Sequence, residues 1–163
     1  MINLCIAKSN ISLPNGWRYP TERELNDSQR IQSNNRYAKV RADFNADSIL
    51  DLALLLKRGV TEGFWVSISN KGSESKWILL DTIQGLISNR YNPLFMGIEI
   101  IKPGTYRYMC FDSDSTCEMI EIEKRKQITI TKPSIEYFMF ESASSIFFWN
   151  DEDKQFIRIW ISD

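Results

Sequence analysis

Histidine is absent from this chain of 163 residues. Its absence removes the commonest general base, the serine–histidine and cysteine–histidine nucleophile pairs, and the usual zinc ligand. Acid–base catalysis would then fall to carboxylates, lysine or tyrosine, and none of these groups stands in a recognisable catalytic setting. The sequence therefore favours a protein that is not an enzyme.

Glycine and proline are scarce, with 7 and 5 residues, whereas aromatic residues make up 12% of the chain. This composition indicates a globular protein rather than a disordered one, and the length suits one domain with a real core. No apolar run approaches the ~20 residues that a membrane span needs. With a formal net charge of −1 and no basic cluster among the aromatics, the chain has no electrostatic signature of nucleic-acid binding.

Only three cysteines are present. Cys110 and Cys117 flank a polar stretch that we expect to be a hairpin tip, and cysteines at the ends of facing strands can reach disulfide geometry. A disulfide is typical of an exported protein. The alternative is two free thiols.

The third cysteine lies in residues 1–7, an apolar stretch that ends in the small-x-small form Cys5-Ile6-Ala7. This ending resembles the tail of a secretory signal, and its alternative is a short first strand. We therefore expect a signal remnant at residues 1–7, a single β-rich domain at residues 8–163, and a periplasmic or otherwise extracytoplasmic location. A cytoplasmic location is the alternative.

An acidic loop follows the first clearly predicted strand. Asp43, Asn45, Asp47 and Asp51 place side-chain oxygens at relative positions 1, 3, 5 and 9, and the Ile49 carbonyl adds a further oxygen. Ca²⁺ takes six to eight oxygen ligands, and alternate residues of a tight loop can point theirs at one ion. This spacing predicts a calcium site.

The arrangement of strand, acidic loop and strand over residues 37–57, with the sequence ADFNADSILDLALL, resembles the calcium hairpin of FG-GAP or VCBS-type repeats. These repeats are the units of integrin-like β-propellers, and the resemblance implies a structural Ca²⁺ ion. Ser48 stands where the family usually has glycine. The alternative is a metal-free polar turn, in which Asp and Asn side chains bond their own backbone.

The periodicity predicts a mostly β fold. Four strands around the acidic loop should form a meander like one propeller blade, and one blade excludes a propeller. Seven more strands are expected at residues 96–102, 105–111, 118–123, 127–131, 135–141, 145–149 and 156–161. A capping box at Thr21 and Glu24 predicts a short helix over residues 21–28, and residues 82–87 suit a helical turn. We therefore expect an antiparallel sandwich or strongly curled sheet with one or two short helices.

For function, the sequence favours a non-catalytic binding protein whose partner is another protein, as in an inhibitor (immunity protein) of a secreted bacterial effector. Trp17, Arg18 and Tyr19 are the candidate contact residues, because these types dominate interface energies when exposed. Packing of the N-terminal segment onto the sheet is their alternative role.

The alternative function is a carboxylate-dependent hydrolase of an envelope polymer, because a pair of carboxylates can cleave glycosidic bonds. The candidate pairs are Glu121 with Glu123 and Glu99 with Asp81.

Overall fold

Strands make up most of the molecule. The computed structural model describes residues 11–85, 92–114, 117 and 121–162, and within these ranges its helical elements are two 3-10 turns, η1 (Arg30–Gln32) and η2 (Ile122–Lys124). The strands are β1 (Lys39–Ala42), β2 (Asp51–Arg58), β3 (Thr61–Asn70), β4 (Ser73–Gln84), β5 (Met96–Ile101), β6 (Gly104–Tyr108), β7 (Cys110–Phe111), β8 (Lys126–Ile130), β9 (Ser134–Met139), β10 (Ser144–Asn150) and β11 (Gln155–Ser162). All the strand pairings are antiparallel. The mostly β, antiparallel fold expected from the sequence is confirmed.

The first sheet, sheet A, is a four-stranded meander in the order β1-β2-β3-β4, as predicted. Its second strand carries the continuous apolar run of the sequence, because both faces of the strand are buried. Ala53 and Leu55 pack toward the second sheet, whereas Leu52, Leu54 and Leu56 pack on the opposite side.

The second sheet, sheet B, has the order β5-β9-β10-β11-β7, and β6 and β8 form a separate two-stranded ribbon. The core between sheets A and B is rich in aromatic rings. Phe64 of β3 stacks on Tyr137 of β9, with ring centroids 4.9 Å apart, and meets Phe147 of β10 edge-on at 5.2 Å. The two sheets therefore form a sandwich.

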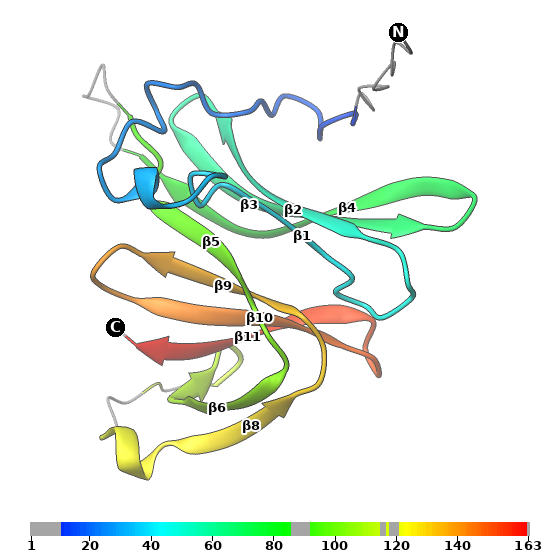
Figure 1. Cartoon of the computed structure of the whole chain (residues 1–163), viewed down its shortest axis with the longest axis vertical. Helices are drawn as coiled ribbons and strands as arrows, with labels where there is room; N and C mark the ends of the chain where they lie inside the picture. The colour runs from blue at the N-terminus through cyan, green and yellow to red at the C-terminus, as the bar shows by residue number, and fades with distance from the viewer. Residues whose placement is uncertain (1–10, 86–91, 115–116, 118–120, 163) are drawn as a thin grey trace, which may run out of the picture.

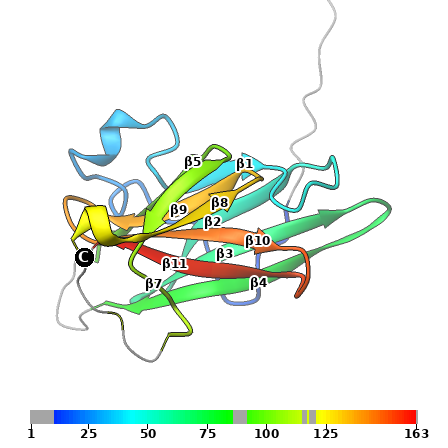
Figure 2. The same ribbon diagram turned by 90° about the horizontal axis from the view of Figure 1, so that it is seen from below.

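The sandwich is covered on both outer faces, which gives four layers in all (Figure 1). Residues 11–17 lie over the outer face of sheet A through Trp17, Ile11 and Leu13. The β6–β8 ribbon covers part of the outer face of sheet B through Ile130 and its neighbours. Seen from below, β10 and β11 cross β3 and β4 at a shallow angle (Figure 2), as in aligned sandwiches.

The helices do not form where the sequence predicted them. Thr21 and Glu24 make both capping-box hydrogen bonds, but the chain leaves the helical path after one turn. Here the Asp27 carboxylate accepts the amide of Gln29 at 2.8 Å, and such local bonds compete with helix. Residues 82–84 belong to β4, so the predicted helical turn is wrong there; residues 86–87 lie outside the described residues.

The hairpin predicted from residues 105–111 and 118–123 is also wrong. β6 pairs with β8, β7 pairs with β11, and residues 122–124 form η2. Residues 118–120 and the predicted signal remnant at residues 1–7 lie outside the described part of the chain. Among the residues that are described, no helix is long and apolar enough to span a membrane.

Candidate functional site

The β1–β2 loop carries the predicted calcium ligands. Its side chains bond the loop's own backbone: Asp43 accepts the amides of Asp47 (3.0 Å) and Ser48 (2.8 Å). Asp47 accepts the amide of Ile49 at 2.8 Å. The Asn45 side chain donates to the Asp47 carboxylate at 3.0 Å and accepts the Asp47 amide at 3.2 Å. These are the contacts expected of a metal-free polar turn.

Asp51 differs from the other predicted ligands because it is fully buried at the base of the loop. Its carboxylate accepts the amides of Phe44 (3.0 Å) and Ser69 (2.9 Å). Burial raises the pKa of Asp51, and these two amides act against that shift. Asp51 therefore ties the loop to β3.

The loop still has the chemistry that calcium requires. Ser48 has φ +69°, so it adopts the left-handed conformation for which the repeat family uses glycine. A carboxylate has about four acceptor sites, so bonds to amides leave lone pairs for an ion. Within the described residues, however, no three acidic, cysteine or histidine side chains gather in a group able to hold a metal. The loop therefore contains oxygen atoms that could bind Ca²⁺, but they are not gathered around one position. Calcium binding stays a prediction.

Trp17, a predicted contact residue, is buried. Its ring lies edge-on to Trp65, with centroids 5.4 Å apart, and the Arg58 guanidinium lies 4.7 Å from its centroid. A Cβ atom at Gly63 would approach the Trp17 ring to 2.5 Å, so the bare glycine backbone makes room for the indole. Trp17 therefore packs the N-terminal segment onto the sheet, which was the alternative role considered from the sequence.

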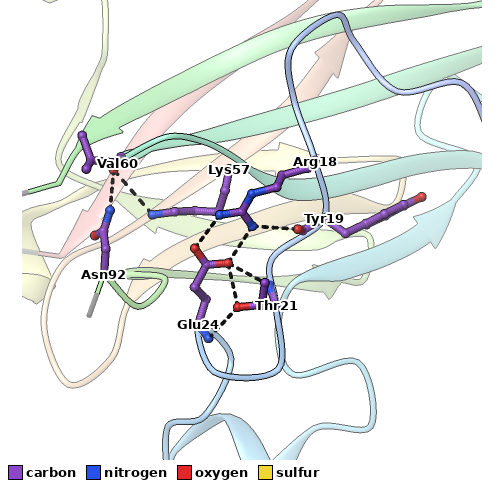
Figure 3. A network of polar contacts seen from close by, with 7 residues as sticks. All are labelled: Arg18, Tyr19, Thr21, Glu24, Lys57, Val60 and Asn92. Atoms are coloured by element: carbon purple, nitrogen blue, oxygen red, sulfur yellow. Dashed lines mark hydrogen bonds and ion pairs between the residues drawn. The ribbon is translucent and has the colours of Figure 1, made fainter. Parts of the chain in front are cut away.

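Arg18 and Tyr19 are the exposed members of the predicted set, and Arg18 belongs to a polar network (Figure 3). The Arg18 guanidinium donates to both carboxylate oxygens of Glu24, at 2.7 and 2.8 Å. Thr21 donates to the same carboxylate from its amide and its hydroxyl. The hydrogen bonds from Arg18 lower the pKa of Glu24 to about 2. The network fastens the N-terminal segment beside the end of β2, where the backbones of Arg18 and Lys57 pair.

Besides Asp51, the charged residues Arg30, Lys57 and Glu62 are fully or almost fully buried. Glu62 accepts the amides of residues 95 and 96, and Arg30 donates to the carbonyls of residues 94 and 96. Burial raises the pKa of Glu62 and lowers that of Lys57, and the opposite charge of each partly offsets the shift of the other. Arg30 and Glu62 thus hold the start of β5 in place.

The predicted Cys110–Cys117 disulfide is confirmed, with Cα atoms 5.5 Å apart. Cys110 lies in β7, where it pairs with Trp160 of β11. The disulfide closes a short loop against the edge of sheet B. Cys5 lies outside the described residues.

A cavity of about 340 Å³ opens on the outer face of sheet B, and residues of η1 and of the β9–β10 turn line it. Three of its lining residues are aromatic: Tyr37, Phe138 and Phe140. Their ring planes meet pairwise at 80°, 74° and 84°, with centroids 5.6, 5.6 and 5.2 Å apart. Three touching, nearly perpendicular rings form the walls of a corner. The other lining residues are Gln29, Gln32, Glu99, Glu136 and Glu141.

The backbone explains how the rings reach this position. Phe138 alternates with the core residue Tyr137, so its side chain faces outward. Gly97 is its cross-strand neighbour, and a Cβ atom there would lie 2.5 Å from the Phe138 ring. Tyr37 has φ +50°, and its carbonyl accepts the Ile98 amide at 2.8 Å. The glycine and the left-handed residue together shape the cavity.

The cavity also brings carboxylates together. Glu99 of β5 and Glu136 of β9 are direct cross-strand neighbours, and like charges in that position destabilise a sheet. None of the three lining glutamates has an ion-pair partner in the part of the chain that the structure describes. This acidic, aromatic cavity is the candidate binding site.

Neither carboxylate pair considered from the sequence is assembled. Asp81 lies on β4 of sheet A, where it binds Arg158 at 3.1 Å, whereas Glu99 lies on the outer face of sheet B. Glu121 and Glu123 are exposed around the η2 turn rather than side by side on a strand, and Glu121 pairs with Lys124. The sequence did not predict the pairing of Glu99 with Glu136, because it depends on the register between β5 and β9.

No protein-family model, curated protein or solved structure matches this chain. The resemblance of residues 37–57 to FG-GAP or VCBS-type repeats therefore stays a prediction from those residues.

Proposed function

We propose that this chain is a non-catalytic binding protein that works outside the cytoplasm and recognises another protein. The observation that carries the proposal is the cavity beside β5 and β9, where three rings and three carboxylates, which have no ion-pair partner among the described residues, surround one opening. Aromatic residues are enriched at protein interfaces, and charges set specificity and association rate. The specific form that we favour is an inhibitor (immunity protein) of a secreted bacterial effector.

The disulfide supports the extracytoplasmic part of the proposal, because disulfides persist in oxidising compartments. A periplasmic or extracellular setting also supplies the calcium that we propose as a structural ion in the β1–β2 loop. Weak sites of the 10⁻⁴–10⁻³ M class, as in extracellular modules, suit a loop whose carboxylates already bond the backbone.

One observation favours a second candidate, a carboxylate-dependent hydrolase of an envelope polymer. Glu99 and Glu136 face the same cavity from adjacent strands, and glycosidases use two carboxyl groups across the scissile bond. Peptidoglycan and lipid hydrolysis assays test this candidate. Turnover that Glu136→Gln abolishes would establish it and overturn the non-catalytic assignment.

The binding proposal is tested by capture from a native envelope fraction with three forms of the purified chain. We expect one protein to be retained by wild type and by the control Glu74→Gln, which removes an exposed charge on β4. Phe138→Leu, which removes one wall of the cavity, should lose that protein. The captured protein should then lose its toxic activity when mixed with the wild-type chain at equal molar amounts. Equal retention by all three forms, or no inhibition, would contradict the proposal.

A further inference from the structure

The three rings of the cavity have the geometry of a cage for an organic cation. The face of an aromatic ring is electrostatically negative, and a cation within about 6 Å of the ring centroid is attracted to it. This chain already uses the effect, since the Arg30 guanidinium lies 5.0 Å from the Phe140 centroid. Arg30 is fully buried and is not part of the lining. The cavity that Tyr37, Phe138 and Phe140 line is open to the surface, so a cation can approach these rings from outside.

The charges of the lining point to the same ligand. Among the described residues, the lining contains Glu99, Glu136 and Glu141 and no lysine or arginine. Glu99 and Glu136 are directly opposed on adjacent strands, so their negative charges repel each other. A cation bound between the rings and these carboxylates would offset the repulsion.

We infer that the cavity receives an alkylammonium group, carried on a lysine side chain of the partner protein. The inference rests on the proposed function, because it names the chemistry by which that partner is recognised. A volume of about 340 Å³ is at the low end of ligand pockets, which run from about 300 to 1,000 Å³. It therefore suits one side chain rather than a polymer. Lysine has a compact ammonium on a four-carbon stem, so the ammonium can lie between the rings and the carboxylates while the stem leads back out of the cavity to the partner.

The test titrates the folded chain, followed by NMR, with Nα-acetyl-lysine methylamide and with its neutral counterpart, Nα-acetyl-norleucine methylamide. We expect saturable binding of the lysine compound with a dissociation constant on the order of millimolar, weaker at high salt. The norleucine compound should bind at least about tenfold more weakly, because it has the stem without the charge. Choline and chitotriose are added as probes for a free quaternary ammonium ligand and for a sugar.

Two variants separate the site from a general loss of folding. Phe138→Leu and Glu136→Gln should each lower the affinity for the lysine compound by about tenfold. Glu74→Gln should leave this affinity unchanged. Glu136→Gln should also raise the melting temperature of the free chain, because it removes the repulsion with Glu99. Weaker binding together with higher stability is a result that a folding defect does not produce.

Several results would overturn the inference. These are equal binding of the lysine and norleucine compounds, chitotriose binding at the same residues, or choline binding without lysine binding. If partner capture succeeds while the lysine compound fails to bind, the inference falls and the proposed function stands. If the lysine compound binds and no partner is captured or inhibited, the cation site stands and the proposed function falls.

Discussion

Glu24 lies at the centre of the polar network that holds the N-terminal segment. One carboxylate receives two hydrogen bonds from Arg18 and two from Thr21. The capping box that appeared in the sequence as the start of a helix is formed, but its role is to join residues 18–24 to each other. A local motif can thus be identified correctly while the element that it normally begins is absent.

The Glu24 network predicts a pH-dependent loss of stability. Glu24→Gln should lower the free energy of unfolding by about 1–2 kcal/mol at pH 7, because a neutral amide with one acceptor oxygen replaces the carboxylate that accepts from Arg18 and Thr21. The folded pKa of about 2 lies below the ordinary 4.5, so the contribution is complete above pH 4.5 and disappears as the pH falls toward 2. Urea unfolding of both proteins at pH 7 and near pH 2 measures the difference. The control is Glu22→Gln, an exposed neighbour, and an undiminished difference near pH 2 would contradict this account.

The β1–β2 loop carries the predicted calcium ligands Asp43, Asn45, Asp47 and Asp51. Calcium should raise the melting temperature of the wild-type chain, because an ion that binds only the native state stabilises it by ~2.7 kcal/mol at a hundredfold excess over its dissociation constant. Asp47→Ala should abolish the shift, whereas Asp153→Ala, in the β10–β11 turn, should keep it. Calorimetry with millimolar Ca²⁺ checks both. No heat and no melting shift in the wild type would leave the loop as a polar turn only.

The disulfide fastens the short segment that ends at Cys117 to the edge strand β7. The double variant Cys110→Ser, Cys117→Ser should lower the free energy of unfolding by about 2 kcal/mol, since the crosslink restricts the unfolded chain over a short loop. Intact mass before and after reduction and alkylation shows whether the bond is present in purified protein. Two free thiols in air-oxidised protein would be the contrary result.

Elements with a local signal were predictable, and contacts between distant segments were not. Alternation and apolar runs predicted the meander of β1 to β4 and the two strands β10 and β11, because each depends on neighbouring residues. The pairing of β6 with β8 was missed, because the sequence gives no measure of which of several similar strands are adjacent. The cavity was missed for the same reason: Tyr37, Glu99 and Phe138 come from three separate segments.

At the scale of the whole molecule, four layers explain why so small a chain contains so many buried apolar residues. Sheet A packs against sheet B on one face and against the N-terminal segment on the other. Sheet B is covered by the β6–β8 ribbon over only part of its outer face, and the cavity lies on the remaining part, beside β5 and β9. In the described part of the chain, the covering layers thus leave this part of the outer face of sheet B open.

Trp17, Arg18 and Tyr19 belong to the N-terminal layer and are also the predicted contact residues. Substitutions at Trp17 and Tyr19 should distinguish a role in packing from a role in partner binding. Trp17→Ala should lower the free energy of unfolding by about 3–5 kcal/mol, because it removes a buried indole. Tyr19→Ala should change it by no more than about 0.5 kcal/mol, since this side chain is 47% exposed. Denaturant unfolding measures both, and partner capture is repeated with Tyr19→Ala. If Tyr19→Ala loses the partner without losing stability, the interface extends to this layer. If Trp17→Ala unfolds no more easily than wild type, the N-terminal segment is not a structural layer.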